Sequence, residues 1–204
     1  GCAAGLHAVI RHHRPRRIIE VGSGHSSKVI SAAVLLEAQE GRAIDYTVID
    51  PFPSKLTASL PGLGRLVPSP VEVTPLEPFL ALREDDLLFI DSSHFVKIGG
   101  DVNFLFLEVL PRLAPGVVIH VHDVGLPFEY PKVYCTNPRY RVFWTEAYLL
   151  QAFLAFNSEF EVLLGMAYVM SDHLPVFRAA FPAYDPAVHT SGSGSFWLRR
   201  KARS

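Results

Sequence analysis

The sequence predicts an α/β fold: a seven-stranded, mostly parallel sheet with an antiparallel last strand and helices on both faces. Three observations lead to this prediction. Short apolar runs alternate with longer amphipathic stretches, Pro or Gly bounds most of the runs, and 49% of the 204 residues are hydrophobic. Alternating strands and helices are typical of parallel sheets, and a chain of this length and composition can bury one sizeable core. We therefore expect residues 1–204 to form a single domain.

The first unit of the expected sheet is a strand, a glycine turn and a helix. A short helix over residues 6–13 leads to an apolar strand over residues 17–21. After the turn, Ser26 and Ser27 are suitable N-cap residues for a helix that closes at Gly41. This order of elements is the repeating unit of a parallel sheet.

The middle strands are short apolar runs. Residues 46–49 form the second strand, and Pro51 prevents it from continuing. Residues 71–73 are a short candidate for the third strand. Residues 87–90 form a fully apolar fourth strand, and the helix after it covers residues 101–110.

The last part of the chain completes the sheet. The fifth strand covers residues 117–121, and a strongly amphipathic helix follows over residues 144–156. Residues 160–164 and 196–199 supply two more strands, with no obvious helix between them. Because a parallel connection needs a crossover helix, we expect these two strands to form an antiparallel pair at the sheet edge.

Charge, hydropathy and cysteine content exclude several classes of protein. Nineteen basic and 20 acidic residues leave a formal charge of −1, so we expect no nucleic-acid partner. No stretch approaches the roughly 18–20 uninterrupted apolar residues of a membrane span. The two cysteines, Cys2 and Cys135, form neither a disulfide framework nor a metal-binding spacing. We expect a cytoplasmic protein, and the sequence leaves open whether it forms a homo-oligomer.

Ionisable residues stand at the carboxyl ends of the expected strands. They occur in residues 20–24 after the first strand, at Asp50 after the second, in residues 91–94 after the fourth, and at His122 and Asp123 after the fifth. Ligands of open parallel sheets bind outside these strand ends. We therefore expect the functional site along this edge.

The first of these loops favours an adenosine ligand. Gly22 and Gly24 allow a ligand to approach the backbone closely. Ser27 replaces the third glycine of a dinucleotide fingerprint, and Asp50 lies further from Gly22 than the roughly 20 residues expected for NAD. Glu20, two residues before Gly22, also counts against NAD. An acid such as Asp50 can accept both ribose hydroxyls of any adenosine cofactor.

These residues resemble the class I S-adenosylmethionine-dependent methyltransferases. The first motif of that family is an acid, any residue, and then Gly-x-Gly. Glu20, Gly22 and Gly24 match this motif, and Asp50 matches the acid that binds the ribose in that family. Six longer strings are similar to a bacterial branch with small-molecule or glycan O-methyltransferases: Phe89-Ile90-Asp91-Ser92-Ser93-His94, Gly100-Asp101-Val102-Asn103, Leu110-Pro111-Arg112-Leu113, Pro115-Gly116-Val117, His120-Val121-His122-Asp123 and Ser195-Phe196-Trp197-Leu198-Arg199. The resemblance covers nearly the whole chain and implies a Rossmann-like sheet of seven strands.

The resemblance also implies a cofactor site for S-adenosyl-L-methionine. The methionine end of the cofactor is expected over the turn of Gly22 and Gly24, with its ammonium held by Asp91. Asp50 is expected to bind the ribose, and the adenine to rest near Phe52. The complete set of expected cofactor-binding residues is Glu20, Gly22, Ser23, Gly24, Ser26, Asp50, Pro51, Asp91 and Ser92.

Methyl transfer to a hydroxyl requires a group that removes its proton, and three residues are candidates for catalysis. His94 and His122 stand at strand ends and titrate near neutral pH, although a purely structural role is a real alternative for each. His94 is the first choice because it follows Asp91 closely. Asp123 is expected to orient a loop or the substrate, and His120 to be buried in the sheet.

A bound metal is not expected. Related catechol-type O-methyltransferases hold magnesium with carboxylates after the fourth and fifth strands and a neighbouring Asn or Asp. Asp91 and Asp123 match the first two positions, but the third falls on Val124, which cannot coordinate a metal. If a metal does bind, the candidate ligands are Asp91, His94 and Asp123, and a softer ion such as Zn or Mn is favoured.

The segment of residues 126–143 is too long and too aromatic for a plain connector. Its aromatic side chains suit a sugar ring or a phenolic acceptor, and Arg139 and Arg141 could hold an anionic group. A structural role, or contact with a second copy of the chain, is an equal alternative. The aromatic residues concerned are Phe128, Tyr130, Tyr134 and Tyr140.

The sequence therefore predicts an S-adenosylmethionine-dependent methyltransferase that acts on a hydroxyl of a small molecule or glycan. Two alternatives remain. One is an NAD-dependent oxidoreductase on a similar sheet, which Ser27 and Glu20 disfavour. The other is a non-catalytic module that keeps the fold and binds cofactor or a partner without turnover.

Overall fold

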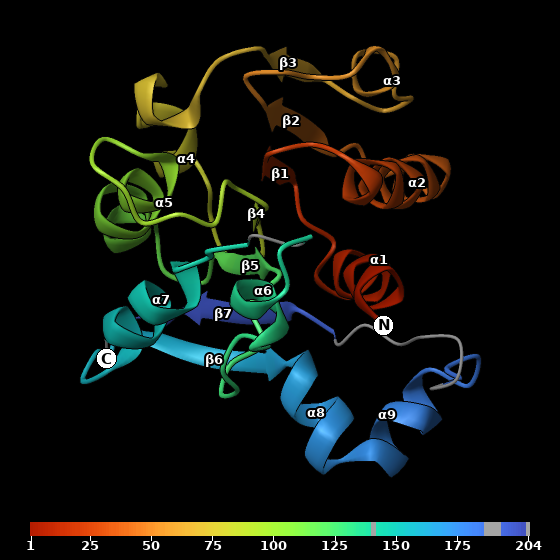
Figure 1. Cartoon of the computed structure of the whole chain (residues 1–204). Coiled ribbons are helices and arrows are strands. Elements are labelled where there is room, and N and C mark those ends of the chain that lie inside the picture. The colour runs from red at the N-terminus through yellow and green to blue at the C-terminus, as the bar shows by residue number, and fades with distance from the viewer. Residues whose placement is uncertain (140–141, 186–192, 203–204) are drawn as a thin grey trace.

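The computed structural model describes residues 1–139, 142–185 and 193–202 and contains one seven-stranded sheet of order β3-β2-β1-β4-β5-β7-β6 (Figure 1). The first five strands in this order run parallel, and β7 pairs antiparallel with both β5 and β6. The strands are β1 (Arg17–Val21), β2 (Asp45–Ile49), β3 (Arg65–Val67), β4 (Leu87–Ile90), β5 (Val118–His122), β6 (Phe160–Gly165) and β7 (Ser195–Arg200). This confirms the predicted fold class.

Helices connect the strands and cover both faces of the sheet (Figure 1). None of those in the described part of the chain has the length and apolar character needed to cross a membrane. The α-helices are α1 (Cys2–His13), α2 (His25–Gln39), α3 (Lys55–Ala58), α4 (Glu77–Leu80), α5 (Asp101–Asn103), α6 (Val133–Thr136), α7 (Glu146–Leu154), α8 (Met166–Asp172) and α9 (Leu174–Ala180). Short 3-10 helices cover Val71–Val73 and Leu110–Arg112, and a π-helix covers Phe104–Val109.

Two apolar cores lie on opposite faces of the sheet because alternate residues of each strand point to opposite sides. On one face, α1 and α2 pack against a core that includes Ile18, Tyr46 and Phe89. On the other face, the helical segment from α5 onward and α7 pack against a core that includes Ile19, Leu88 and Ile119. The central strands are thus buried on both sides, which explains their continuous apolar runs.

The predicted third strand was wrong. Residues Val71–Val73 form a 3-10 helix, and the third strand is Arg65–Val67, which pairs with β2. The β-branched composition of the Val71 segment suggested a strand, but Pro70 stands directly before it and Val73 is 69% exposed. The true strand lies at the sheet edge and has only three residues, so its apolar signal is weak.

Other boundaries also differ from the prediction. Gly24, rather than Ser26 or Ser27, is the N-cap of α2, which begins at His25. Strand β5 includes His122, which was placed just after it. Two helices, α8 and α9, lie between β6 and β7 where none was expected, although the two strands do pair antiparallel as predicted.

Candidate functional site

The carboxyl ends of four parallel strands meet at one edge of the sheet. In the register of the ladders, Val21 of β1 lies beside both Ile49 of β2 and Ile90 of β4, and Ile90 lies beside Val121 of β5. The residues that follow these positions therefore share one edge. The structure brings together the ionisable strand ends that the sequence placed there.

The glycine turn after β1 depends on the absence of a side chain at Gly22. This residue has φ +79°, and a Cβ on it would lie 1.9 Å from the carbonyl oxygen of Asp91. Gly24 is different, because its backbone is extended and a Cβ there would meet nothing within 4 Å. Gly22 lets the β1 and β4 loops approach each other, and Gly24 faces open space at the site.

Glu20 lies beneath this turn with no exposed surface. Its Oε1 accepts hydrogen bonds from Ser26 Oγ (2.9 Å) and Ser27 Oγ (3.0 Å), and its Oε2 accepts one from the Tyr46 hydroxyl. Burial raises the pKa of Glu20 to about 7, against the opposing effect of these hydrogen bonds. Glu20 thus joins the start of α2 to β1 and β2.

Asp50 stands at the end of β2 and is 9% exposed. Its Oδ1 accepts a hydrogen bond from the backbone N–H of Phe52 at 2.7 Å, and its Oδ2 accepts one from the hydroxyl of Ser23. Ser23 therefore links the glycine turn to the end of the second strand. Next to Asp50, Pro51 is exposed and the Phe52 side chain is 90% exposed.

A cluster of acids and histidines occupies the ends of β4 and β5. Asp91 Oδ1 lies 3.5 Å from His94 Nε2 and 3.5 Å from His122 Nδ1. Asp123 joins the same cluster, with one oxygen 3.3 Å from His122 Nδ1 and the other 4.0 Å from His94 Nε2. The sequence placed these four residues at the site, and the structure brings them into contact.

Glu146, at the first position of α7, is a member of this cluster that the sequence analysis missed. Its carboxylate is fully buried, with Oε2 2.7 Å from His94 Nδ1 and Oε1 accepting a hydrogen bond from Ser92 Oγ at 3.1 Å. A signal was present in the sequence. Glu146 lies four residues before the buried Leu150 and therefore on the inward face of the amphipathic helix.

Both histidines of the cluster are stabilised as imidazolium ions. Burial lowers the pKa of His94, but the hydrogen bonds and charges of Asp91 and Glu146 outweigh it and raise this pKa to about 9. Burial also lowers the pKa of His122. Hydrogen bonds and charges of Asp123 and Asp91 outweigh this effect and raise the pKa to about 10. The pKa of Asp91 is lowered because the two histidines outweigh its burial.

Two of the cluster residues have strained backbones. His94 has φ +62° and Asp123 has φ +57°, in the left-handed region that residues with side chains rarely adopt. The backbone carbonyl of His94 accepts hydrogen bonds from the N–H groups of Thr145 (2.9 Å) and Glu146 (3.2 Å). The start of α7 thus holds His94 in this conformation, and such strain is often stored at functional sites.

His120 is buried as predicted, and its ring lines a cavity at the site. The Trp197 indole N–H donates to Ser195 Oγ (2.9 Å), and the same oxygen lies 2.7 Å from His120 Nε2. Nδ1 of the His120 ring is buried and has no hydrogen-bond partner among the described residues. This ring lines a cavity of about 180 Å³, called here the helix-start pocket, together with Cys2, Ala3, Leu6, His25, Ser26, Val29, Phe89 and His122.

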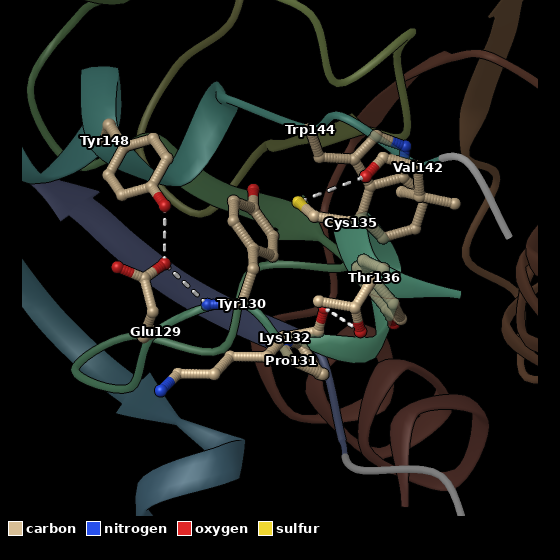
Figure 2. A pocket seen from close by; sticks show the side chains of 10 residues that line it. Glu129, Tyr130, Pro131, Lys132, Cys135, Thr136, Val142, Trp144 and Tyr148 are labelled. Atoms are coloured by element: carbon tan, nitrogen blue, oxygen red, sulfur yellow. Dashed lines mark hydrogen bonds between the residues drawn. The ribbon is translucent and has the colours of Figure 1, made fainter. Parts of the chain in front are cut away.

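A second cavity, called here the aromatic pocket, has a volume of about 230 Å³. Most of its lining comes from the segment of residues 126–143, for which substrate binding and a structural role were equal alternatives, and Figure 2 shows its side chains. Tyr140 and Arg141 of that segment lie outside the described residues. The lining residues are Glu129, Tyr130, Pro131, Lys132, Tyr134, Cys135, Thr136, Val142, Trp144 and Tyr148.

No group of three His, Cys, Asp or Glu side chains in the described part of the chain is arranged to hold a metal ion. Asp91, His94 and Asp123, the predicted ligands if a metal were bound, form ion pairs with separations of 3.5–4.0 Å instead. Val124 is buried in the core. Metal-independent chemistry stays a prediction.

Comparison with known proteins decides the family. A family model described as "Methyltransferase domain" matches residues 19–124, which is more than half of the chain and includes the end of β1 and all of β2 to β5. The chain belongs to this methyltransferase domain family. No curated protein matches the sequence. Membership supports the predicted cofactor, S-adenosyl-L-methionine, over the alternative of NAD.

Two solved structures share the fold of this methyltransferase domain. A protein from Thermobifida fusca YX that was assigned as a methyltransferase has 15% sequence identity and a TM-score of 0.58, with 98% of this chain and 79% of that chain covered. The apo-structure of CmcI-N160 has 17% identity and a TM-score of 0.54, with 98% and 71% covered. At these identities the likeness concerns the fold.

The open space at Gly24 leads to a prediction about cofactor binding by the methyltransferase domain. Replacing Gly24→Val should weaken binding of S-adenosylhomocysteine by roughly 100-fold or more, about 3 kcal/mol, because the side chain enters the cofactor path. The extended backbone accommodates the substitution, so the melting temperature should change little. Calorimetric titration and thermal unfolding measure the two effects, with Gly24→Ala as a smaller step. Unchanged affinity in Gly24→Val would remove this turn from the cofactor site.

The burial of Glu20 leads us to expect that the stability of the fold depends on pH. Because its pKa is about 7 in the folded chain and about 4.5 when unfolded, the folded state holds the proton more tightly. Its contribution is therefore complete below pH 4.5 and is lost as the pH rises through 7. Relative to Glu20→Gln, the wild type should lose about 3 kcal/mol of unfolding free energy between pH 4 and pH 8. Denaturant unfolding of both proteins at several pH values tests this prediction. If the unfolding free energies of the wild type and Glu20→Gln changed in parallel with pH, the prediction would be contradicted.

Proposed function

We propose that this chain transfers a methyl group from S-adenosyl-L-methionine to a hydroxyl group of a small molecule, with His94 as the general base. One observation carries the proposal. A single edge of the sheet has the open turn at Gly24, the buried carboxylate of Asp50 and a histidine held by a buried acid, Glu146. The first two residues suit a cofactor, and the pair of His94 and Glu146 suits proton transfer.

The residues at this edge fit S-adenosyl-L-methionine. The absence of a Cβ at Gly24 leaves space beside the backbone, and Asp50 has lone pairs for ribose hydroxyls next to the exposed ring of Phe52. Ser23 holds the Asp50 carboxylate in place, whereas Glu20, buried under three hydroxyl donors, acts by positioning the turn. When bound, the cofactor supplies an electrophilic methyl group on a sulfonium sulfur.

The helix-start pocket suits the amino-acid end of this cofactor. The first turn of α2, a helix of 15 residues, lines it through His25 and Ser26, and the partial positive charge of a helix start favours a carboxylate. His120 adds a buried ring nitrogen without a described partner, and its side chain lines the same pocket. Asp91, whose lowered pKa keeps it ionised, suits the ammonium group.

The charge of the site also supports a cationic cofactor. Three carboxylates, those of Asp91, Asp123 and Glu146, surround two histidines. With both histidines protonated and all three acids ionised, the cluster has a surplus of one negative charge. A positive ligand beside Asp91 would compete for that carboxylate and, by like-charge repulsion, lower the pKa of His94 and His122. Cofactor binding therefore favours the neutral imidazole that a general base requires.

In the proposed reaction, a lone pair of the acceptor hydroxyl forms the new O–C bond as the S–C bond breaks, and the hydroxyl proton passes to Nε2 of neutral His94. Glu146 accepts a hydrogen bond from Nδ1–H, which keeps Nε2 as the accepting nitrogen. Ser92 donates to the second oxygen of Glu146 and fixes its orientation. Glu146 is thus a positioning residue, and Asp123 and His122 complete the surroundings of His94.

Removal of the proposed base should act on turnover rather than on cofactor binding. His94→Ala should slow methyl transfer by roughly 100-fold or more and leave the affinity for S-adenosylhomocysteine within a few-fold of the wild type. His173→Ala, at the exposed junction of α8 and α9, is the matched control and should keep full activity. Single-turnover methyl transfer measures the rate. Wild-type turnover in His94→Ala would exclude it as the base.

The raised pKa of His94 predicts a pH dependence. In the free enzyme the fraction of neutral His94 grows as the pH rises toward 9, so kcat/KM should rise between pH 7 and pH 9. Glu146→Gln removes the negative charge that helps to raise this pKa, and the rise should therefore move to lower pH. A lower rate with an unshifted profile would indicate a structural role for Glu146 only.

A binding experiment tests the proposed function as a whole. The protein is titrated calorimetrically with S-adenosylmethionine, S-adenosylhomocysteine and NAD, each with and without magnesium or zinc. Micromolar binding of the two sulfur ligands alone is the expected result. Binding of NAD alone would overturn the proposal, and sulfur-ligand binding without turnover across an acceptor screen would favour the non-catalytic alternative. Dependence on added metal would contradict metal-independent chemistry.

A further inference from the structure

The aromatic pocket shares a wall with the proposed base. The ring of Trp144 lies 4.4 Å from the ring of His94 and also lines the pocket. Thr145 and Glu146, the next residues along the chain, hold His94 through its backbone carbonyl and its imidazole. A ligand in the pocket is therefore separated from His94 by one side chain and lies next to the site.

Four aromatic rings of the described residues line the pocket, and all the close ring pairs among them except Tyr130 and Tyr134, at 32°, meet at steep angles. Trp144 meets Tyr134 at 80° and Tyr130 at 70°, with ring centroids 5.4 Å and 6.1 Å apart, and Tyr148 meets Tyr130 at 79°. Figure 2 shows the Tyr130 ring between Tyr148 and the group of Cys135 and Trp144. Such a wall offers both ring faces and ring edges, which are the two surfaces that a further aromatic ring contacts favourably.

Many polar groups of the pocket already have partners within the chain. The Tyr148 hydroxyl donates to Glu129 Oε1 at 2.6 Å, and the Tyr130 hydroxyl accepts a hydrogen bond from the N–H of Ala147 at 3.0 Å. The Thr136 hydroxyl donates to the carbonyl of Lys132 at 3.0 Å. A sugar has hydroxyls around its whole ring and would need many new partners here to offset its lost hydration, whereas an aromatic ring would need few.

The charge and the size of the aromatic pocket limit the classes of ligand that it can bind. Glu129 and Lys132 are both exposed and of opposite sign, so the lining carries no net charge that would select an ion. The volume of about 230 Å³ exceeds the roughly 150 Å³ of a cavity that binds benzene. The space suits a neutral aromatic group of one or two rings.

We propose that the aromatic pocket binds the ring of the acceptor, and that the acceptor is therefore a neutral aromatic compound with a hydroxyl group rather than a glycan. This inference rests on the proposed function, because it identifies the substrate class of the same site. The ring is held between Trp144, Tyr134 and Tyr148, and the hydroxyl extends past Trp144 toward His94. The step itself is the one given above: the oxygen gains the methyl group and His94 the proton.

Binding of three probes to the whole chain tests the inference. The probes are 2-naphthol, its saturated counterpart decahydro-2-naphthol, and methyl α-glucoside, each titrated in the presence of S-adenosylhomocysteine. We expect 2-naphthol to bind at least tenfold more tightly than either of the others. Equal or tighter binding of methyl α-glucoside would overturn the inference, and equal binding of decahydro-2-naphthol would show that aromatic contacts do not select the ligand.

Variants locate the binding site. Tyr134→Leu keeps an apolar side chain but removes one ring of the pocket, and it should weaken 2-naphthol binding at least fivefold. Tyr168→Leu is the matched control, since Tyr168 is 42% exposed on α8 and does not line the pocket. It should change the affinity less than twofold. Equal affinity of the wild type and Tyr134→Leu would overturn the assignment.

A chemical readout covers the case in which Tyr134→Leu fails to fold. Cys135 is exposed and lines the pocket, so its alkylation by iodoacetamide, measured on the peptide that contains Cys135, reports on occupancy. We expect 2-naphthol to slow this alkylation at least fivefold, and an unchanged rate would overturn the inference. Failure of 2-naphthol to bind a chain that binds S-adenosylhomocysteine rejects this inference alone. Failure to bind S-adenosylhomocysteine rejects the proposed function.

Discussion

The close approach of the loops after β1 and β4 is the constraint on which the site depends. Gly22 and the carbonyl of Asp91 are so near that no side chain fits between them, and the N–H of Asp91 donates to the carbonyl of Val21 at 2.8 Å. This contact places Asp91 beside the glycine turn. From there, the short loop after β4 brings His94 to Asp91, and the parallel register brings His122 to the same carboxylate.

A second layer of polar contacts holds this edge from below and from the side. Glu20 joins the first turn of α2 to two strands, and Ser23 joins the turn to Asp50. On the other side, Glu146 links α7 to His94. Each of these carboxylates is buried and hydrogen-bonded, because an ionised group away from water without partners would be destabilising. The cost of burial remains visible in the raised pKa values of Glu20 and Glu146.

In the function we propose, the cofactor residues come from the first half of the chain and the residues that bind the acceptor ring come from the second. The family model covers residues 19–124 and stops before the aromatic pocket, whose lining begins at Glu129. The proposed cofactor residues therefore all lie in the part of the chain that the family model matches. In our proposal the segment between β5 and α7 sets the acceptor preference, and the Trp144 ring connects that segment to His94.

The sequence by itself determined the fold class, the central strands and most of the residues at their carboxyl ends. Apolar runs such as Leu87–Ile90 are buried on both faces, so their composition identifies them regardless of context. The edge strand Arg65–Val67 and the place of Glu146 were decided only by tertiary structure. A three-residue edge strand exists because β2 offers it a partner, and an acid on an apolar helix face is acceptable because His94, distant in sequence, meets it there. Local patterns record burial and turns, whereas partners brought together by folding leave little trace in either segment alone.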